Sequence, residues 1–105
     1  GGGIRTADLD AGALPVSIGR SRTCTIAVDR RHASVSGRHL EIIAIDDAGA
    51  TVAVLGDNGI AIESVPHPPG ATVAWPWGAI CELASTGAPT GEPACSLLLT
   101  RAWEA

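Results

Sequence analysis

Three polar side chains that lie far apart in the sequence have the types needed to hold a phosphate group on a peptide. Arg20 comes directly after a short apolar stretch, Ser36 lies in the segment that leads into another, and Asn58 lies in a turn rich in Gly and Asp. An arginine presents a planar fork of donors that fits two phosphate oxygens, and a serine hydroxyl adds another donor. A carboxamide both donates and accepts, which suits a peptide backbone. If loops bring them together, these three residues would form a phosphopeptide pocket.

Each of these residues also has a simpler interpretation. Arg20 could form a surface ion pair, and Ser36 could cap a turn through its hydroxyl. Asn58-Gly59 is a strong signal for a type I′ turn, so it supports the fold more directly than it supports binding. The phosphopeptide interpretation is favoured because the three residues, and His39 near Ser36, all lie in segments at the ends of predicted strands, where loops cluster.

An enzyme is a further interpretation, with Ser36 or Cys24 as nucleophile and His39 as base. No third group is placed to orient that base, and no G-x-S-x-G motif occurs, which disfavours catalysis. A metal site is disfavoured too, because no C-x-x-C pair occurs and the three histidines lack ligand spacing. We therefore expect no catalytic residue, no metal and no cofactor.

The charges are unevenly distributed along the 105 residues, although the net charge is only −4 and the pI about 5.1. Residues 20–38 hold five Arg and one acid, Asp29, for a net +4, whereas the remainder has two Arg against ten acids, or −8. An acidic chain argues against a general nucleic-acid binder. One arginine-rich segment favours a focused anion site, which Arg22, Arg31 and Arg38 would flank, and one of them could read acidic peptide residues.

The three cysteines, Cys24, Cys81 and Cys95, are expected to be buried reduced thiols in a cytoplasmic protein. No apolar run approaches the roughly 20 residues of a membrane span, and the N-terminus lacks the apolar region of a signal peptide. The sequence therefore predicts no membrane insertion.

Short apolar segments separated by turn residues predict an all-β domain, with no segment of helical periodicity. Residues 1–12 are expected to be a lead-in strand or partly disordered, and 13–102 the domain. The run 40–45 is apolar on both faces, as in a strand buried within a sandwich. Residues 46–49 predict a hairpin turn, and 85–93 a mobile surface loop. The predicted strands are 16–18, 25–28, 40–45, 51–55, 60–62, 71–75, 79–83 and 96–100.

The chain has three Trp and no Phe, Tyr or Met, so its core must consist mainly of Val, Ile, Leu and Ala. Trp75 is expected in this core, and Trp77 in a partly exposed turn. Trp103 is expected to pack on the sandwich or to begin a linker.

The ordered set of motifs resembles the forkhead-associated (FHA) family over roughly positions 13–100. The resemblance rests on Gly19-Arg20, Ser36-Gly37-Arg38-His39, Asn58-Gly59 and the segment 69–73. It implies a two-sheet sandwich of about eleven short strands that recognises phosphothreonine peptides through loops at one end. It also implies that Arg20 and Ser36 hold the phosphate, that Asn58 fixes the peptide backbone, and that Gly19, His39 and Gly59 are structural.

Two departures from the family pattern lie next to the expected binding residues and are expected to reduce their affinity for a phosphopeptide. The position after Ser36 often has a polar or basic side chain in the family, whereas Gly37 offers only a backbone N–H. The position before Asn58 is Asp57, whose carboxylate would repel a phosphate if it turned inward, and Ile60 replaces the usual Thr. We expect Gly37, Arg38 and Asp57 to contribute to binding at a reduced or unusual affinity.

The leading function is thus a phosphothreonine-binding module for a partner such as a Ser/Thr kinase, within a larger protein. The Lys-free, Arg- and Ala-rich composition suggests a bacterial origin with a GC-rich genome. The alternative is a degenerate FHA scaffold that binds proteins independently of phosphate, for example in a bacterial secretion system.

Overall fold

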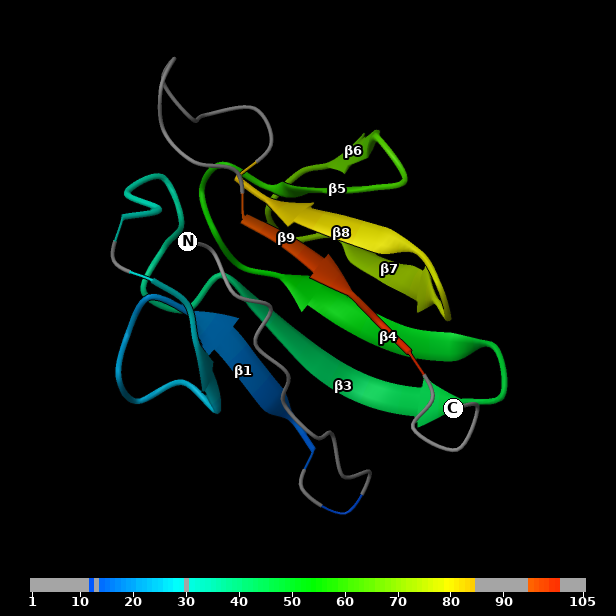
Figure 1. Ribbon diagram of the computed structural model, residues 1–105. Coiled ribbons are helices and arrows are strands. Elements are labelled where there is room, and N and C mark those ends of the chain that lie inside the picture. The colour runs from blue at the N-terminus through cyan, green and yellow to red at the C-terminus, as the bar shows by residue number, and fades with distance from the viewer. Residues whose placement is uncertain (1–11, 13, 30, 85–94, 101–105) are drawn as a thin grey trace.

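The computed structural model describes residues 12, 14–29, 31–84 and 95–100, and those residues contain nine strands arranged in two sheets (Figure 1). The nine strands are β1 (Val16–Gly19), β2 (Ile26–Ala27), β3 (Leu40–Asp46), β4 (Gly49–Val54), β5 (Ile60–Ile62), β6 (Val65–His67), β7 (Thr72–Pro76), β8 (Ile80–Leu83) and β9 (Cys95–Leu98). The predicted all-β sandwich is confirmed. The described residues account for nine of the roughly eleven strands that the family resemblance implies.

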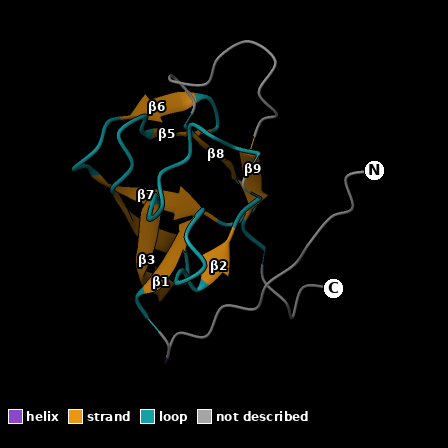
Figure 2. Cartoon of the chain, turned by 90° about the vertical axis from the view of Figure 1, so that its left-hand side faces the viewer, coloured by secondary structure: helices purple, strands orange, loops and turns teal. Residues whose placement is uncertain are grey.

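One sheet has five strands in the order β2-β1-β3-β4-β7, and the other has four in the order β6-β5-β8-β9. All neighbouring strands are antiparallel except β1 and β2, which are parallel. Figure 2 shows the two sheets from one end, with loops crossing between them. Because β4 and β5 belong to different sheets, the segment 55–59 carries the chain from one sheet to the other.

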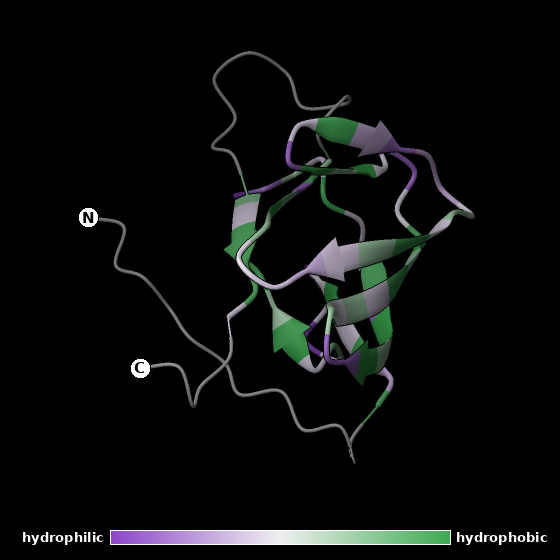
Figure 3. Cartoon of the chain, turned by 90° about the vertical axis from the view of Figure 1, so that its right-hand side faces the viewer, coloured by the Kyte–Doolittle hydropathy of each residue, from purple (hydrophilic) through white to green (hydrophobic). Residues whose placement is uncertain are grey.

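The core lies between the two sheets and consists mainly of aliphatic side chains. Alternate residues of each strand point to opposite faces, so hydrophobic and hydrophilic bands follow one another along the ribbons in Figure 3. Trp75 is buried and donates its indole N–H to the Ala79 carbonyl, whereas Trp77 is only partly buried. Both positions agree with the sequence prediction. The most deeply buried side chains are Val16, Ile18, Val35, His39, Leu40, Ile42, Val52, Val54, Ile60 and Cys81.

The three cysteines are free and buried, as the sequence predicts. Burial raises the pKa of the Cys81 thiol to about 12, and the neighbouring Cys95 and Glu82 act in the same direction. A thiol with such a high pKa stays protonated at neutral pH and is a poor nucleophile.

The β3–β4 hairpin forms where Asp46 and Gly49 predict it. The Asp46 carboxylate accepts hydrogen bonds from the backbone N–H groups of Ala48 and Gly49, at 2.8 and 3.2 Å. Gly49 has a φ of +145°, and a Cβ there would overlap the Trp75 carbonyl of β7. The turn therefore requires both the aspartate and the glycine.

The expectation that residues 40–45 are buried on both faces is wrong. Leu40 and Ile42 are buried, but the pairing of β3 with β4 shifts between Ile42 and Ala44 and leaves Ile43 43 % exposed. This β-bulge changes which side chains face the core, so the second half of β3 lies mostly at the surface.

Two further local features differ from the sequence prediction. The sequence did not predict β6, a short edge strand that contains Pro66 and joins β5 through the turn at Glu63 and Ser64. Asn58-Gly59 does not form a type I′ turn, because only Gly59 has a positive φ, +66°. The Gly59 N–H instead donates to the Gly56 carbonyl and closes a turn that links the two sheets.

Several expectations fall on residues outside those that the structure describes. They are the lead-in 1–12, apart from Gly12, the whole loop 85–93 and Trp103. The domain boundaries at 13 and 102 therefore remain predictions.

Candidate functional site

Three loops meet at the left-hand end of the molecule in Figure 1. They are the β1–β2 loop (residues 20–25), the β2–β3 loop (residues 28–39) and the β4–β5 loop (residues 55–59). These loops contain every residue that the sequence predicts for the phosphopeptide site. The strands that precede and follow them are anchored in the core, so the ends of the loops are fixed.

Arg20 is bound at both its backbone and its side chain to the β2–β3 loop. Its backbone N–H donates to the Ser36 carbonyl at 3.1 Å, and its Nε donates to the Val35 carbonyl. Val35 itself is only 1 % exposed, so this contact is anchored in the core. Among the described residues, no group accepts a hydrogen bond from the two Nη atoms of Arg20, so Nε positions the guanidinium while these donors remain available.

The Gly37 carbonyl is held against the β1–β2 loop by two donors. The Ser21 N–H lies 3.0 Å from this oxygen, and the Cys24 Sγ also lies 3.0 Å from it. A Cβ at Gly19 would overlap the same oxygen, so the approach of the two loops requires glycine at position 19. This contact fixes Ser36 and Gly37 next to Arg20.

His39 connects the site to both sheets. Its ring is 0 % exposed; Nδ1 accepts the Ser36 N–H at 2.9 Å, and Nε2 lies 2.7 Å from the Gly59 carbonyl. Since Nδ1 accepts, the proton belongs on Nε2, which donates to Gly59. The Ala84 N–H then pairs with the Gly59 carbonyl at 3.0 Å rather than with Nε2, which lies 3.3 Å away.

Burial lowers the pKa of His39, although the hydrogen bond to Gly59 and the Asp57 carboxylate act in the opposite direction. A second proton on the ring would also face the Ser36 N–H, which is itself a donor. His39 is therefore a neutral imidazole.

Asn58 lies on the β4–β5 loop and reaches across to the β2–β3 loop. Its Nδ2 donates to the Ser34 carbonyl at 2.9 Å. Asn58, Arg20 and His39 therefore bind three successive residues, Ser34, Val35 and Ser36 in that order. The three predicted binding residues are thus brought to one short segment of chain.

Of the charged residues near this segment, Arg31 and Asp29 form an ion pair with each other. Arg31 contacts Asp29 at 3.4 Å, which is the one ion pair within the part of the chain that the structure describes. The Arg31 N–H, followed by the Arg31 and His32 charges, holds the pKa of Asp29 below its usual value. Arg38 and Asp57 are exposed.

His39 cannot act as a general base for Ser36 in this arrangement. Its Nδ1 binds the backbone N–H of Ser36, its Nε2 binds Gly59, and the ring is buried. Within the described residues, no cluster of His, Cys, Asp and Glu could hold a metal ion. No helix there is long and apolar enough to cross a bilayer.

Sequence reasoning missed two residues that the site depends on. A Cβ at Gly56 would overlap the His39 ring, and the Gly56 N–H donates to the His39 carbonyl at 2.9 Å. Cys24 was considered as a buried thiol, but its contact with Gly37 gives it a part in shaping the loop. Neither role is visible in the sequence, because both depend on residues 13 or more positions away.

The sequence and the fold of this chain are similar to those of known FHA domains. A profile of the FHA domain matches residues 16–76. The FHA domain of FhaA, solved in a complex with the intracellular domain of Rv3910, is 28 % identical with a TM-score of 0.59, and the match covers 76 % of this chain and 80 % of that one. A structure from an analysis of phosphothreonine-dependent FHA interactions is 26 % identical with a TM-score of 0.54, covering 66 % and 67 %.

A more distant structure shares the fold. The N-terminal FHA domain of Rad53p from S. cerevisiae, in complex with a phosphothreonine peptide, has a TM-score of 0.69 at 11 % identity, covering 92 % of this chain and 83 % of that one. No curated protein sequence matches the chain. The profile match spans more than half of the sequence, and the structure is a two-sheet sandwich like the FHA domains it matches. The chain therefore belongs to the FHA domain family.

Proposed function

We infer that this domain binds phosphothreonine-containing peptides and has no catalytic activity of its own. The observation that carries the proposal is the arrangement around residues 34–36, where Asn58 donates to the Ser34 carbonyl and Arg20 donates to the carbonyls of Val35 and Ser36. A phosphate carries about −1.5 to −2 charges and three acceptor oxygens at neutral pH, which matches an arginine beside a serine hydroxyl and a backbone N–H.

Each residue has a distinct role in this proposal. The Nη donors of Arg20, the Ser36 hydroxyl and the Gly37 N–H hold the phosphate. Asn58 fixes the backbone of the peptide while its Nδ2 supports the β2–β3 loop through Ser34. Arg38 contributes positive charge at the margin of the site, and Asp57 limits the affinity.

The cellular setting is also a proposal. The expected partner is a phosphothreonine-containing protein or a Ser/Thr kinase, and the domain is one part of a larger bacterial signalling or scaffold protein. A cytoplasmic location is supported by the three free cysteines, because thiols remain reduced in that compartment. The proposed binding requires neither a cofactor nor nucleic acid.

The test is a calorimetric titration of the protein with matched peptides that contain phosphothreonine, phosphoserine or threonine. We expect binding only to the phosphorylated peptides, and a loss of at least tenfold in Arg20→Ala and Ser36→Ala, because hydrogen bonds to a charged group contribute about 1.5–3 kcal/mol each. Arg31→Ala is the matched control, since Arg31 is an exposed arginine of the β2–β3 loop, which also contains Ser36, and already pairs with Asp29.

Equal binding of the phosphorylated and unphosphorylated peptides would overturn the proposal. The alternative, a scaffold that binds partners independently of phosphate, predicts that co-purified partners remain bound after phosphatase treatment. Loss of those partners on treatment would instead support the phosphothreonine function.

A further inference from the structure

The loop end of the molecule presents two arginines that the proposed phosphate contacts do not require. Arg22 and Arg38 are both exposed, and neither forms an ion pair with a carboxylate of the described residues. Arg31 differs from them, because Asp29 lies 3.4 Å from it and partly neutralises it. Among the arginines that the structure describes at this end, Arg22 and Arg38 therefore add to Arg20 as positive charge available for an external anion.

The backbone places Arg22 and Arg38 beside the phosphate-binding segment. The Ser21 N–H donates to the Gly37 carbonyl at 3.0 Å, so Arg22 and Arg38 follow directly after two hydrogen-bonded residues. Arg38 also lies near Gly19, since a Cβ there would come within 2.9 Å of the Arg38 Cα. The two side chains thus start from adjoining points, two residues beyond Arg20 and Ser36.

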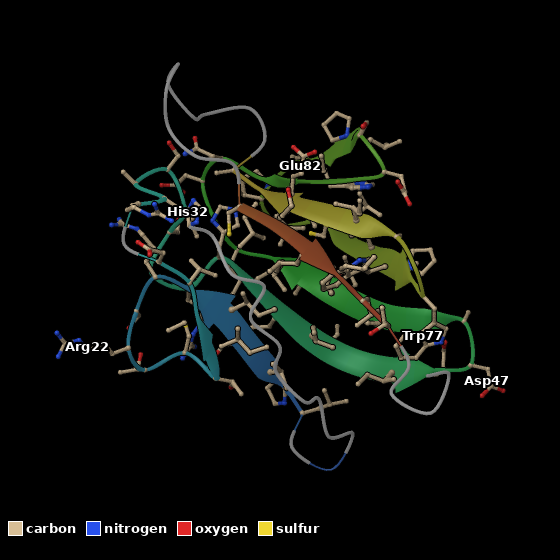
Figure 4. The ribbon with its side chains drawn as sticks, in the orientation of Figure 1. Arg22, His32, Asp47, Trp77 and Glu82 are labelled. Atoms are coloured by element: carbon tan, nitrogen blue, oxygen red, sulfur yellow. The ribbon has the colours of Figure 1, made fainter. Side chains whose placement is uncertain are left out.

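The charges of the whole molecule reinforce this arrangement. Figure 4 shows Arg22 extending into solvent at one end of the domain, whereas Asp47 lies at the opposite end on the β3–β4 turn. Residues 20–38 carry +4 and the rest of the chain −8. The positive charge of the arginine-rich segment therefore favours acidic peptides at the loop end, with Asp57 of the β4–β5 loop opposing it in part.

We propose that Arg22 and Arg38 form a subsite for anionic side chains that flank the phosphothreonine. This subsite rests on the proposed function, and it defines the preferred ligands as phosphothreonine peptides with Asp, Glu or a second phosphorylated residue near the first. Arginine is suited to both carboxylate and phosphate, because its guanidinium presents paired donors to either group. Basic residues at the same peptide positions are disfavoured by like-charge repulsion.

The experiment uses fluorescence anisotropy with the full chain and four peptides of equal length. Each peptide has one central phosphothreonine, flanked by alanines, aspartates, lysines or a second phosphothreonine. At low ionic strength we expect the aspartate peptide to bind about fivefold more tightly than the alanine peptide, since exposed ion pairs contribute a few-fold each. The doubly phosphorylated peptide should gain at least as much affinity over the alanine peptide, and the lysine peptide should bind more weakly than the alanine peptide.

The variants separate the subsite from the phosphate contacts. In the double variant Arg22→Gln/Arg38→Gln, the aspartate-to-alanine ratio should fall to about one, even though the loss of the Arg38 charge also weakens the binding of the alanine peptide. Arg31→Gln, the matched control, should keep the fivefold ratio. An unchanged ratio in the double variant, or equal binding of the aspartate and lysine peptides, would overturn the subsite.

The two proposals fail in distinguishable ways. If only the subsite is wrong, the alanine peptide still binds in a phosphate-dependent and Arg20-dependent manner, with no preference among flanking residues. If the proposed function is wrong, no phosphorylated peptide binds better than its unphosphorylated counterpart, and the subsite as stated is overturned with it.

Discussion

Restoring a donor side chain after Ser36 is expected to tighten phosphopeptide binding, because nothing in the structure requires glycine at position 37. A Cβ at Gly37 would meet only the Ser21 Cβ, at 3.8 Å, which is an ordinary contact, and Gly37 does not have a positive φ. Gly37→Asn therefore places an amide donor next to Ser36 without backbone strain. This position contrasts with Gly19, where a Cβ overlaps backbone.

The size of the effect follows from two opposing terms. A hydrogen bond to a charged group contributes about 1.5–3 kcal/mol. Ordering the new side chain costs about 0.5–1.5 kcal/mol. A net gain of about 1 kcal/mol corresponds to roughly fivefold tighter binding. Gly37→Asp should weaken binding by a similar factor, since a carboxylate would repel the phosphate.

The assay is calorimetric titration of one phosphothreonine peptide against the parent protein and three variants. Gly37→Ala is the matched control, because it adds the Cβ without a donor. Both Gly37→Ala and Gly37→Asn should raise the free energy of unfolding by about 0.4–1 kcal/mol by restricting the unfolded chain. Only Gly37→Asn should bind more tightly, and equal affinities of these two variants would refute the reasoning.

Three further outcomes concern the stability of the free domain. Because the pKa of His39 is lowered in the folded state, the unfolded state binds more protons than the folded state just below pH 6.5. The contribution of His39 to the free energy of unfolding should therefore be complete above that pH and decline as the pH falls. Urea titrations at several pH values measure this decline, and a His67→Gln control should keep it. Gly19→Ala should lower the free energy of unfolding by about 1–3 kcal/mol through overlap with the facing loop, and a thermal midpoint equal to that of the parent would contradict the close approach. Glu63→Asn with Ser64→Gly should raise the free energy of unfolding by about 1 kcal/mol, because both residues have positive φ, +48° and +69°; no rise in urea resistance would count against strain in this turn.

Local patterns predicted most strands because each one is a short apolar or alternating segment between clear turn signals. β6 was missed because Val65-Pro66-His67 has a proline and little apolar pattern, and a proline is accepted only because β6 lies at a sheet edge. The bulge at Ile43 is set by the pairing of β3 with β4, which a single segment cannot reveal.

The site shows the same limit. Arg20, Ser36 and Asn58 could be chosen from their chemistry and order, and the structure brings their loops together. The type of the Asn58-Gly59 turn could not be predicted, because the strands on either side of it belong to different sheets. The need for glycine at position 56 comes from the His39 ring, which lies 17 positions earlier in the chain.

The imidazole of His39 links residue 36 to the junction between the sheets, so we expect these two regions to open and close as one cooperative unit. Ser36 precedes β3 of one sheet, whereas Gly59 and Ala84 lie next to β5 and β8 of the other. A ligand that binds Ser36 adds about 2.7 kcal/mol to the stability of this unit when its free concentration is about 100 times its Kd. Deuterium exchange at the Ala84 amide, on the far side of the ring, should therefore slow when the loop is occupied.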